Sequence, residues 1–104
     1  MNPDLYFVQI LAAVLFVIGI AVVLTRRNVF FLLMGVELAL NAANLSFIGF
    51  ARTLPSDAAL IGQIVPLFSI AVAAAEACVG LAMVILVYRA RESLDSESFT
   101  SLKE

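Results

Sequence analysis

The sequence has no histidine and only one cysteine, Cys78. A single cysteine cannot form a disulfide within the chain, and without histidine or a second cysteine there is no ligand set for a zinc site. We therefore interpret Cys78, which lies in an apolar run, as a small packing residue. The sequence also lacks a glycine-rich dinucleotide fingerprint and the cysteines of an iron–sulphur site, so we expect no cofactor on this chain.

Charge is also scarce, because Asp, Glu, Lys and Arg make up 13% of the 104 residues while hydrophobic residues make up 63%. Ordinary soluble domains have about 25% charged and about 45–50% apolar residues. A soluble core of this size could not cover so much apolar surface, so the composition predicts an integral membrane protein. No basic patch with interleaved aromatic residues is present, which excludes a nucleic-acid partner.

Three apolar runs predict an all-α membrane fold with three transmembrane helices, at residues 5–24, 29–50 and 61–88. About 20 helical residues cross the ~30 Å hydrocarbon core of a bilayer. The third run begins at Ala58 and is too long for one upright span, and Pro66 within it predicts a kink or a helix start nearby. We treat residues 1–104 as one membrane domain whose polar tail, 89–104, is either disordered or docks as a short amphipathic piece.

The arginines predict the orientation of the spans. Arg26, Arg27, Arg89 and Arg91 fall on one side of the membrane, and Arg52 falls on the other. Because basic loops stay in the cytoplasm, we expect the N-terminus outside and the C-terminus in the cytoplasm. Arg26 and Arg27 could also contact lipid phosphates or acidic residues of a partner subunit, although topology alone accounts for them.

The second span contains one ionisable residue, Glu37, and Asn41 and Asn44 follow it at i+4 and i+7 on the same helical face. A charged carboxylate at mid-bilayer is expensive, so Glu37 can be neutral there and still ionise when a cation or water approaches. This behaviour suits a proton relay, and the alternative is a protonated glutamate that only hydrogen-bonds neighbouring helices. Asn41 and Asn44 either orient waters and the carboxyl or hold helices together.

A second carboxyl, Glu76, lies near the middle of the third apolar run. Ala73, Ala77 and Gly80 beside it form a stripe of small residues that allows close contact between helices. We therefore expect Glu76 to be a second buried carboxyl, on a different helix from Glu37 and at a similar depth. Two such glutamates make a proton pathway more credible than one, because intramembrane carboxyls are costly and usually functional.

The chain resembles the K subunit of respiratory complex I, the NADH-quinone oxidoreductase whose mitochondrial counterpart is subunit 4L. The resemblance covers nearly the whole chain, including the three spans and the basic connection between the first two. The stretches that carry it are Thr25-Arg26-Arg27-Asn28, Gly35-Val36-Glu37-Leu38 with Asn41-Ala42-Ala43-Asn44, and Ala73-Ala74-Ala75-Glu76-Ala77 with Gly80-Leu81-Ala82.

The resemblance implies a non-redox subunit in the membrane-arm helix bundle of a proton-pumping enzyme. Glu37 and Glu76 would correspond to the family's two membrane glutamates, in a lateral path from the quinone-proximal region to the antiporter-like subunits. NADH, flavin, iron–sulphur clusters and quinone would bind to partner subunits. The expected partners are the A, H, J and antiporter-like N-type subunits, in an obligate hetero-oligomer of the bacterial inner (cytoplasmic) membrane.

Two other interpretations stay open at this point. The C subunit of multisubunit sodium/proton antiporters is similar to the same family, and it would share the three spans and a mid-membrane glutamate without electron transfer. A purely structural membrane-arm subunit would tolerate neutral residues at both glutamates. A rotary-ring proteolipid fits less well, since it typically needs a two-helix hairpin with one essential carboxyl.

Overall fold

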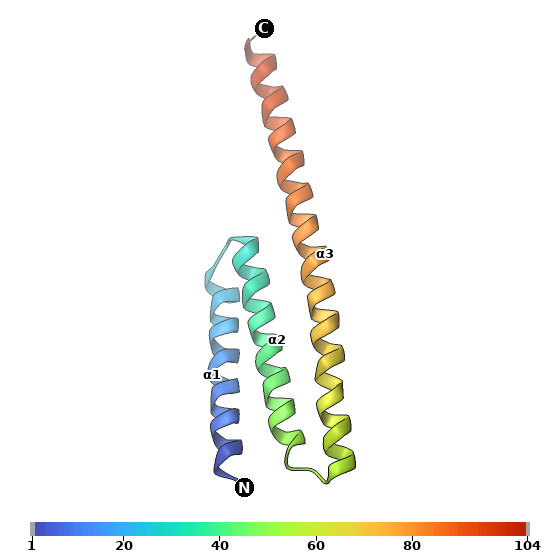
Figure 1. Cartoon of the computed structure of the whole chain (residues 1–104). Helices are drawn as coiled ribbons and strands as arrows, with labels where there is room; N and C mark the ends of the chain where they lie inside the picture. Colours follow the sequence, from blue (N-terminus) through green and yellow to red (C-terminus); the bar gives the residue numbers. More distant parts are fainter. Residues whose placement is uncertain (1, 104) are drawn as a thin grey trace.

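The computed structural model describes residues 2–103, and these residues form three α-helices joined by short connections (Figure 1). The helices are α1, Pro3–Thr25, α2, Val29–Ala51, and α3, Ser56–Lys103. Each of the three is long and apolar enough to cross a membrane. The prediction of an all-α membrane protein with three spans is therefore confirmed.

Asparagine caps begin the first two helices. The side-chain oxygen of Asn2 accepts a hydrogen bond from the backbone N–H of Asp4, and that of Asn28 accepts one from Phe30 at 2.9 Å. A cap of this kind satisfies one of the N–H groups that the first helical turn leaves unpaired. The connection between α1 and α2 is only three residues long, so the two helices are antiparallel neighbours, as the sequence predicted.

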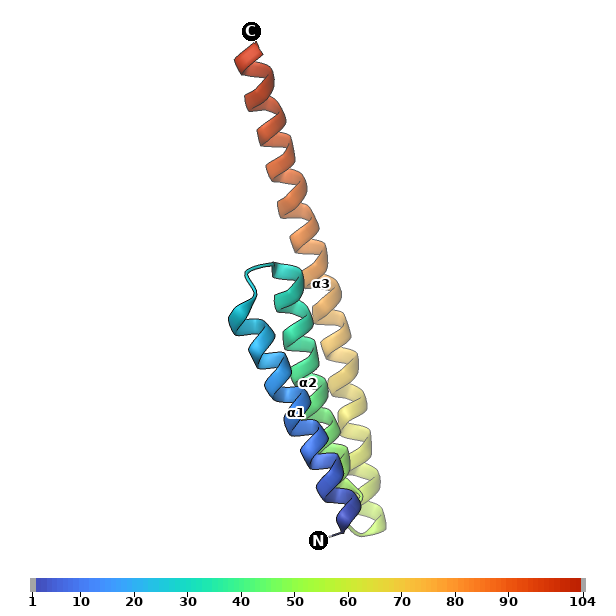
Figure 2. The same cartoon turned by 90° about the vertical axis from the view of Figure 1, so that its left-hand side faces the viewer.

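The three helices lie side by side in a single layer. The chain measures 74 × 26 × 12 Å, so its thickness is close to the diameter of one helix. α2 lies between α1 and α3, which do not contact each other within residues 2–103. Figures 1 and 2 show this layer in two perpendicular views. Both broad faces of the layer are consequently uncovered, and most large apolar side chains are exposed on them.

α1 and α2 approach each other closely through small residues. A Cβ added to Gly19 would lie 2.7 Å from the carbonyl oxygen of Gly35 and 2.8 Å from the backbone nitrogen of Ala39. Nearer the other end, the Gln9 side-chain amide donates to the Ser46 carbonyl at 3.0 Å, and the Ser46 hydroxyl donates back to the Gln9 side-chain oxygen. Gln9 is therefore an interface residue between α1 and α2.

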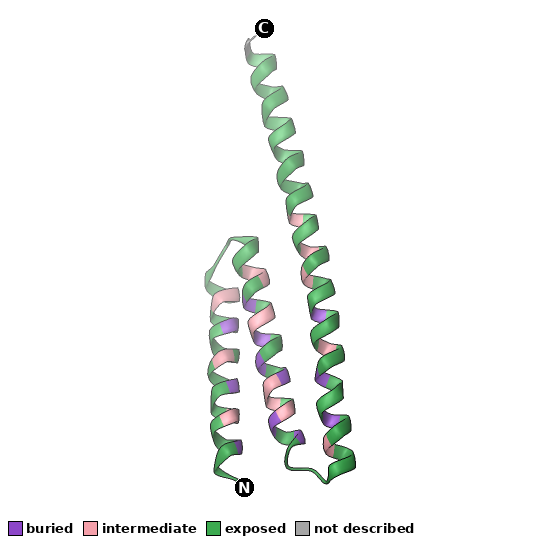
Figure 3. Cartoon of the chain, viewed as in Figure 1, coloured by how far each residue is buried: buried purple, intermediate pink, exposed green. Residues whose placement is uncertain are grey.

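α3 packs on the opposite face of α2, again through small residues. Gly62, Pro66 and Ala73 are buried along its contact side, and Ala77 and Gly80 are half-buried. Figure 3 shows that the buried positions of each helix follow its contact with a neighbour. The small-residue stripe predicted from the sequence thus faces α2.

α3 is longer than the predicted third span. The helix does not start near Pro66 but at Ser56, and Pro66 lies inside it with its side chain fully buried. The C-terminal segment is helical as well, because α3 continues to Lys103, and its side chains from Arg89 to Leu102 are exposed. A helix that has already nucleated extends cheaply, and no glycine or proline follows Gly80 to stop it.

We predict that Gly19→Ala lowers the free energy of unfolding by about 1–3 kcal/mol, because the added methyl group meets backbone atoms that cannot move aside. Thermal unfolding of the protein, solubilised with its native partners in a mild detergent, measures the loss. Gly80→Ala is the matched control, since its new Cβ would meet only the flexible Leu33 side chain, at 3.2 Å. Equal stability of the two variants would contradict the close approach at Gly19.

Candidate functional site

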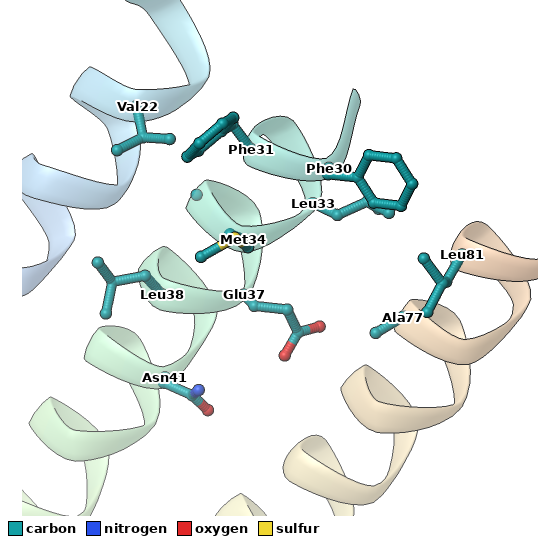
Figure 4. Close-up of a pocket in the computed structure, with 11 residues that line it drawn as sticks. Val22, Phe30, Phe31, Leu33, Met34, Glu37, Leu38, Asn41, Ala77 and Leu81 are labelled. Carbon is teal, nitrogen blue, oxygen red and sulfur yellow. The ribbon is translucent and has the colours of Figure 1, made fainter. Parts of the chain in front are cut away.

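Glu37 opens into a groove that runs across α2, from Val22 of α1 to Ala77 and Leu81 of α3. The groove has a volume of about 640 Å³, and Glu37 and Asn41 are the ionisable and amide residues in its lining. Figure 4 shows the Glu37 carboxyl pointing from α2 into the space in front of Ala77 and Leu81 of α3. The rest of the lining is apolar, so the carboxyl stands in surroundings that offer its charge little support.

The polar face predicted for the second span is present and is turned towards α3. Asn41 lies one turn beyond Glu37 on the same side of α2 (Figure 4). Asn44 is buried. It lies seven residues after Glu37 and seven residues before Ala51, and Ala51 contacts Gly62 of α3. Residues seven apart share a helical face, so Asn44 also faces α3.

Contacts at two places fix the antiparallel register of α2 and α3. A Cβ added to Gly62 would lie 2.7 Å from the Cβ of Ala51, and one added to Gly80 would lie 3.2 Å from the Leu33 side chain. Both helices advance ~1.5 Å per residue. Glu76 is therefore level with Glu37, since each lies four residues inside the contact between Leu33 and Gly80.

The two glutamates differ in their surroundings. Glu37 is half-buried in the groove, whereas Glu76 is exposed on the surface of the chain. The expectation of a second buried carboxyl is thus not met within this chain. The reason is geometric: Glu76 shares a side of α3 with Ser69 and Gly80 but lies at its edge, about 100° from Ala77, and the broad face of the layer beside that edge is uncovered.

Arg26 and Arg27 lie in the connection between α1 and α2 and are exposed. The guanidinium of Arg26 lies over the ring of Phe31, 5.3 Å from its centre, in a cation–π contact. Phe31 also lines the groove, so this contact links the basic connection to one end of the groove. Phe31 was not identified from the sequence as a residue of the site. Phe30, Leu33 and Met34 also line the groove, and their helical spacing from Glu37 is the signal that could have identified them.

Asn44 is the one buried polar residue in the described part of the chain whose side chain has an unpaired nitrogen. An unsatisfied buried donor generally costs about 1–3 kcal/mol. Asn41, in contrast, is exposed towards the groove. Chemically, the groove presents the Glu37 carboxyl as its ionisable group, with the Asn41 amide beside it on the same side of α2.

Comparison with known proteins assigns the chain to a family. Residues 7–104 match the family of NADH-ubiquinone/plastoquinone oxidoreductase chain 4L. The chain belongs to this family. It is 49% identical to NAD(P)H-quinone oxidoreductase subunit 4L of Synechocystis sp., over 99% of both chains. It is 52% identical to NADH-quinone oxidoreductase subunit K of Anaeromyxobacter sp., over 90% of this chain and 92% of that one.

A chloroplast relative extends the same pattern. The chain is 47% identical to the chloroplastic NAD(P)H-quinone oxidoreductase subunit 4L of Chlorokybus atmophyticus, over 90% of this chain and 92% of that one. The resemblance to the K subunit is therefore confirmed. These relatives carry the names of quinone oxidoreductase subunits and not of antiporter subunits, which favours the first of the interpretations that the sequence left open.

We predict that cysteines at positions 33 and 80 form a disulfide on mild oxidation in native membranes. The pair is introduced as Leu33→Cys with Gly80→Cys, in a Cys78→Ala background so that no other thiol competes. Mass spectrometry after blocking of free thiols measures the product. Leu33→Cys with Ala73→Cys is the control, since Ala73 lies on the same face of α3 about two turns away. Disulfide formation by the control pair alone would refute the register that makes Glu37 level with Glu76.

Proposed function

We propose that this chain is a membrane-arm subunit of a proton-pumping NADH-quinone oxidoreductase, in which Glu37 relays protons during pumping coupled to quinone reduction. The observation that carries the proposal is the place of Glu37, half-buried in an apolar groove and level with Glu76 on the next helix. An ionisable group within a membrane is costly to keep, and such groups mark ion and proton pathways. The membership of the family of chain 4L supports the same assignment.

The register of α2 and α3 sets the orientation of the relay relative to the membrane plane. A proton reaches the Glu37 carboxyl through water in the groove, and the Asn41 amide orients that water or the carboxyl itself. Because Glu76 is at the same level, transfer from Glu37 to Glu76 runs across the helices and parallel to the membrane plane. Glu76 is exposed on this chain, so it passes the proton to a group on a neighbouring subunit.

The partners and cofactors of this assembly are part of the proposal. Both broad faces of the layer are apolar and uncovered, which supports an obligate hetero-oligomer with the A, H, J and antiporter-like N-type subunits. The electron-transfer cofactors and the quinone site belong to partner subunits, and this chain supplies protonatable side chains only. We place the complex in the bacterial inner membrane, with Arg26 and Arg27 on its cytoplasmic side and the N-terminus outside.

Glu37→Gln tests the relay directly. The substitution keeps the size of the side chain and its ability to hydrogen-bond but removes the titratable group, so proton pumping in sealed membranes is expected to fall by a factor of about 10². Glu37→Asp retains a carboxyl and is expected to keep part of the pumping. Proton uptake driven by NADH, measured with a pH-sensitive dye, gives the rate.

Glu97→Gln is the matched control for this experiment. It makes the same chemical change at an exposed carboxyl in the last turns of α3, outside the groove, and is expected to leave pumping unchanged. If Glu37→Gln pumped as well as Glu97→Gln, the relay would be refuted, and a structural role for the chain would follow.

Glu76→Gln tests whether the two glutamates act in one path. Residues that act in series are not additive, so the double variant with Glu37→Gln is expected to pump no more slowly than the slower single variant. The same proton-uptake assay measures all three variants, with the amount of assembled enzyme as the reference. Multiplied effects in the double variant would show that Glu37 and Glu76 act separately.

A further inference from the structure

Asn44 is a buried polar side chain without a complete set of partners. Its exposed fraction is 9%, and its side-chain nitrogen has no hydrogen-bond partner. Buried side-chain amides in folded proteins are nearly always paired with protein or with ordered water. The side chain lies on the α3 side of α2, as its spacing of seven residues from Glu37 and from Ala51 requires.

The register places Ser69 opposite Asn44. Ser69 lies seven residues beyond Gly62, and Asn44 lies seven residues before Ala51, the residue that contacts Gly62. Ser69 is half-buried on the contact side of α3, between Pro66 and Ala73. Among the described residues, the Ser69 hydroxyl makes no hydrogen bond to Asn44 or to any other side chain. Two polar side chains therefore stand at one level of the interface, each with hydrogen-bonding capacity to spare.

Pro66 leaves a third polar group unpaired further along the same interface, about 10 Å from Ser69. Proline has no N–H, so the carbonyl oxygen of Gly62, four residues earlier, loses its partner within the helix. Pro66 is fully buried and Gly62 is buried, so bulk solvent does not meet this carbonyl. In membrane helices, ordered water commonly satisfies the groups that an internal proline leaves free.

We propose that α2 and α3 bind an internal water molecule between Asn44 and Ser69. The Asn44 amide donates to the water, and the water bridges to the Ser69 hydroxyl. Water reaches this place from the groove, because Asn41 in the groove lining lies one turn before Asn44 on the same face. The site extends hydration from Glu37 along the interface towards Pro66.

The water site rests on the packing of α2 and α3 and does not require Glu37 to carry protons. If the proposed function holds as well, the bound water lies on the face that Glu37 shares with Asn41 and Asn44, and it supplies a proton-conducting neighbour to the groove. Asn44 is then a positioning residue, since it acts through the water that it holds.

A cryo-electron microscopy structure of the assembled enzyme, at a resolution that shows ordered water, tests the proposal. We expect density within about 2.7–3.2 Å of both the Asn44 amide and the Ser69 hydroxyl. Asn44→Leu, of similar size but unable to hydrogen-bond, should remove this density. Ser46→Ala should retain it, because Ser46 is a membrane-embedded serine on the opposite face of α2, paired with Gln9. A dry interface, or a direct bond between Asn44 and Ser69, would overturn the proposal.

A second measurement separates the water site from the relay. Proton pumping is compared in Asn44→Leu, Ser69→Ala and the double variant, each normalised to assembled enzyme. If one water serves both residues, the double variant pumps within about twofold of the slower single variant, whereas independent residues would multiply their effects. If the water density between Asn44 and Ser69 is observed and Glu37→Gln pumps normally, the water site is supported and only the relay is refuted.

Discussion

Within the hydrocarbon core of a bilayer no solvent is at hand to pair a polar group, so each one must be met by protein or by bound water. Apart from the Gly62 carbonyl, which faces Pro66, the interiors of the three helices pair their own backbones, and a few polar side chains remain. Gln9 is paired with Ser46 across α1 and α2. Glu37 opens onto the groove, and Asn44 is turned inwards against α3. These side chains determine which face of α2 can meet which neighbour.

The two interfaces of α2 are built differently, and this difference creates the site. Against α1, the backbones of Gly19 and Gly35 come so close that neither glycine can accept a methyl group without movement. Against α3, the Leu33 side chain stands between the helices at Gly80, and a groove opens beside Glu37. The tightly packed pair α1 and α2 thus supplies one part of the groove lining, through Val22 and Gly35, and α3 supplies another, through Ala77 and Leu81.

Much of the fold follows from patterns that a sequence displays directly. The lengths of the apolar runs gave the first two helices almost to the residue, and the spacing of Glu37, Asn41 and Asn44 predicted their common face. The exposure of Glu76 could not be predicted, because the small-residue stripe gives the contact side of α3 but does not show that the layer leaves the edge of that side uncovered. The length of α3 was also missed, since a polar sequence does not by itself show whether a helix continues into it.

The chain is about as thick as a single helix, and we expect this to affect how long it persists in the cell. A layer of this kind has no interior that is independent of its neighbours, so nearly all of its apolar contacts must come from other subunits or from lipid. In a copy without its complex the Glu76 side chain is exposed, and a carboxyl exposed to hydrocarbon would be in an unfavourable state. We therefore expect a copy without its complex to be degraded sooner than an assembled one.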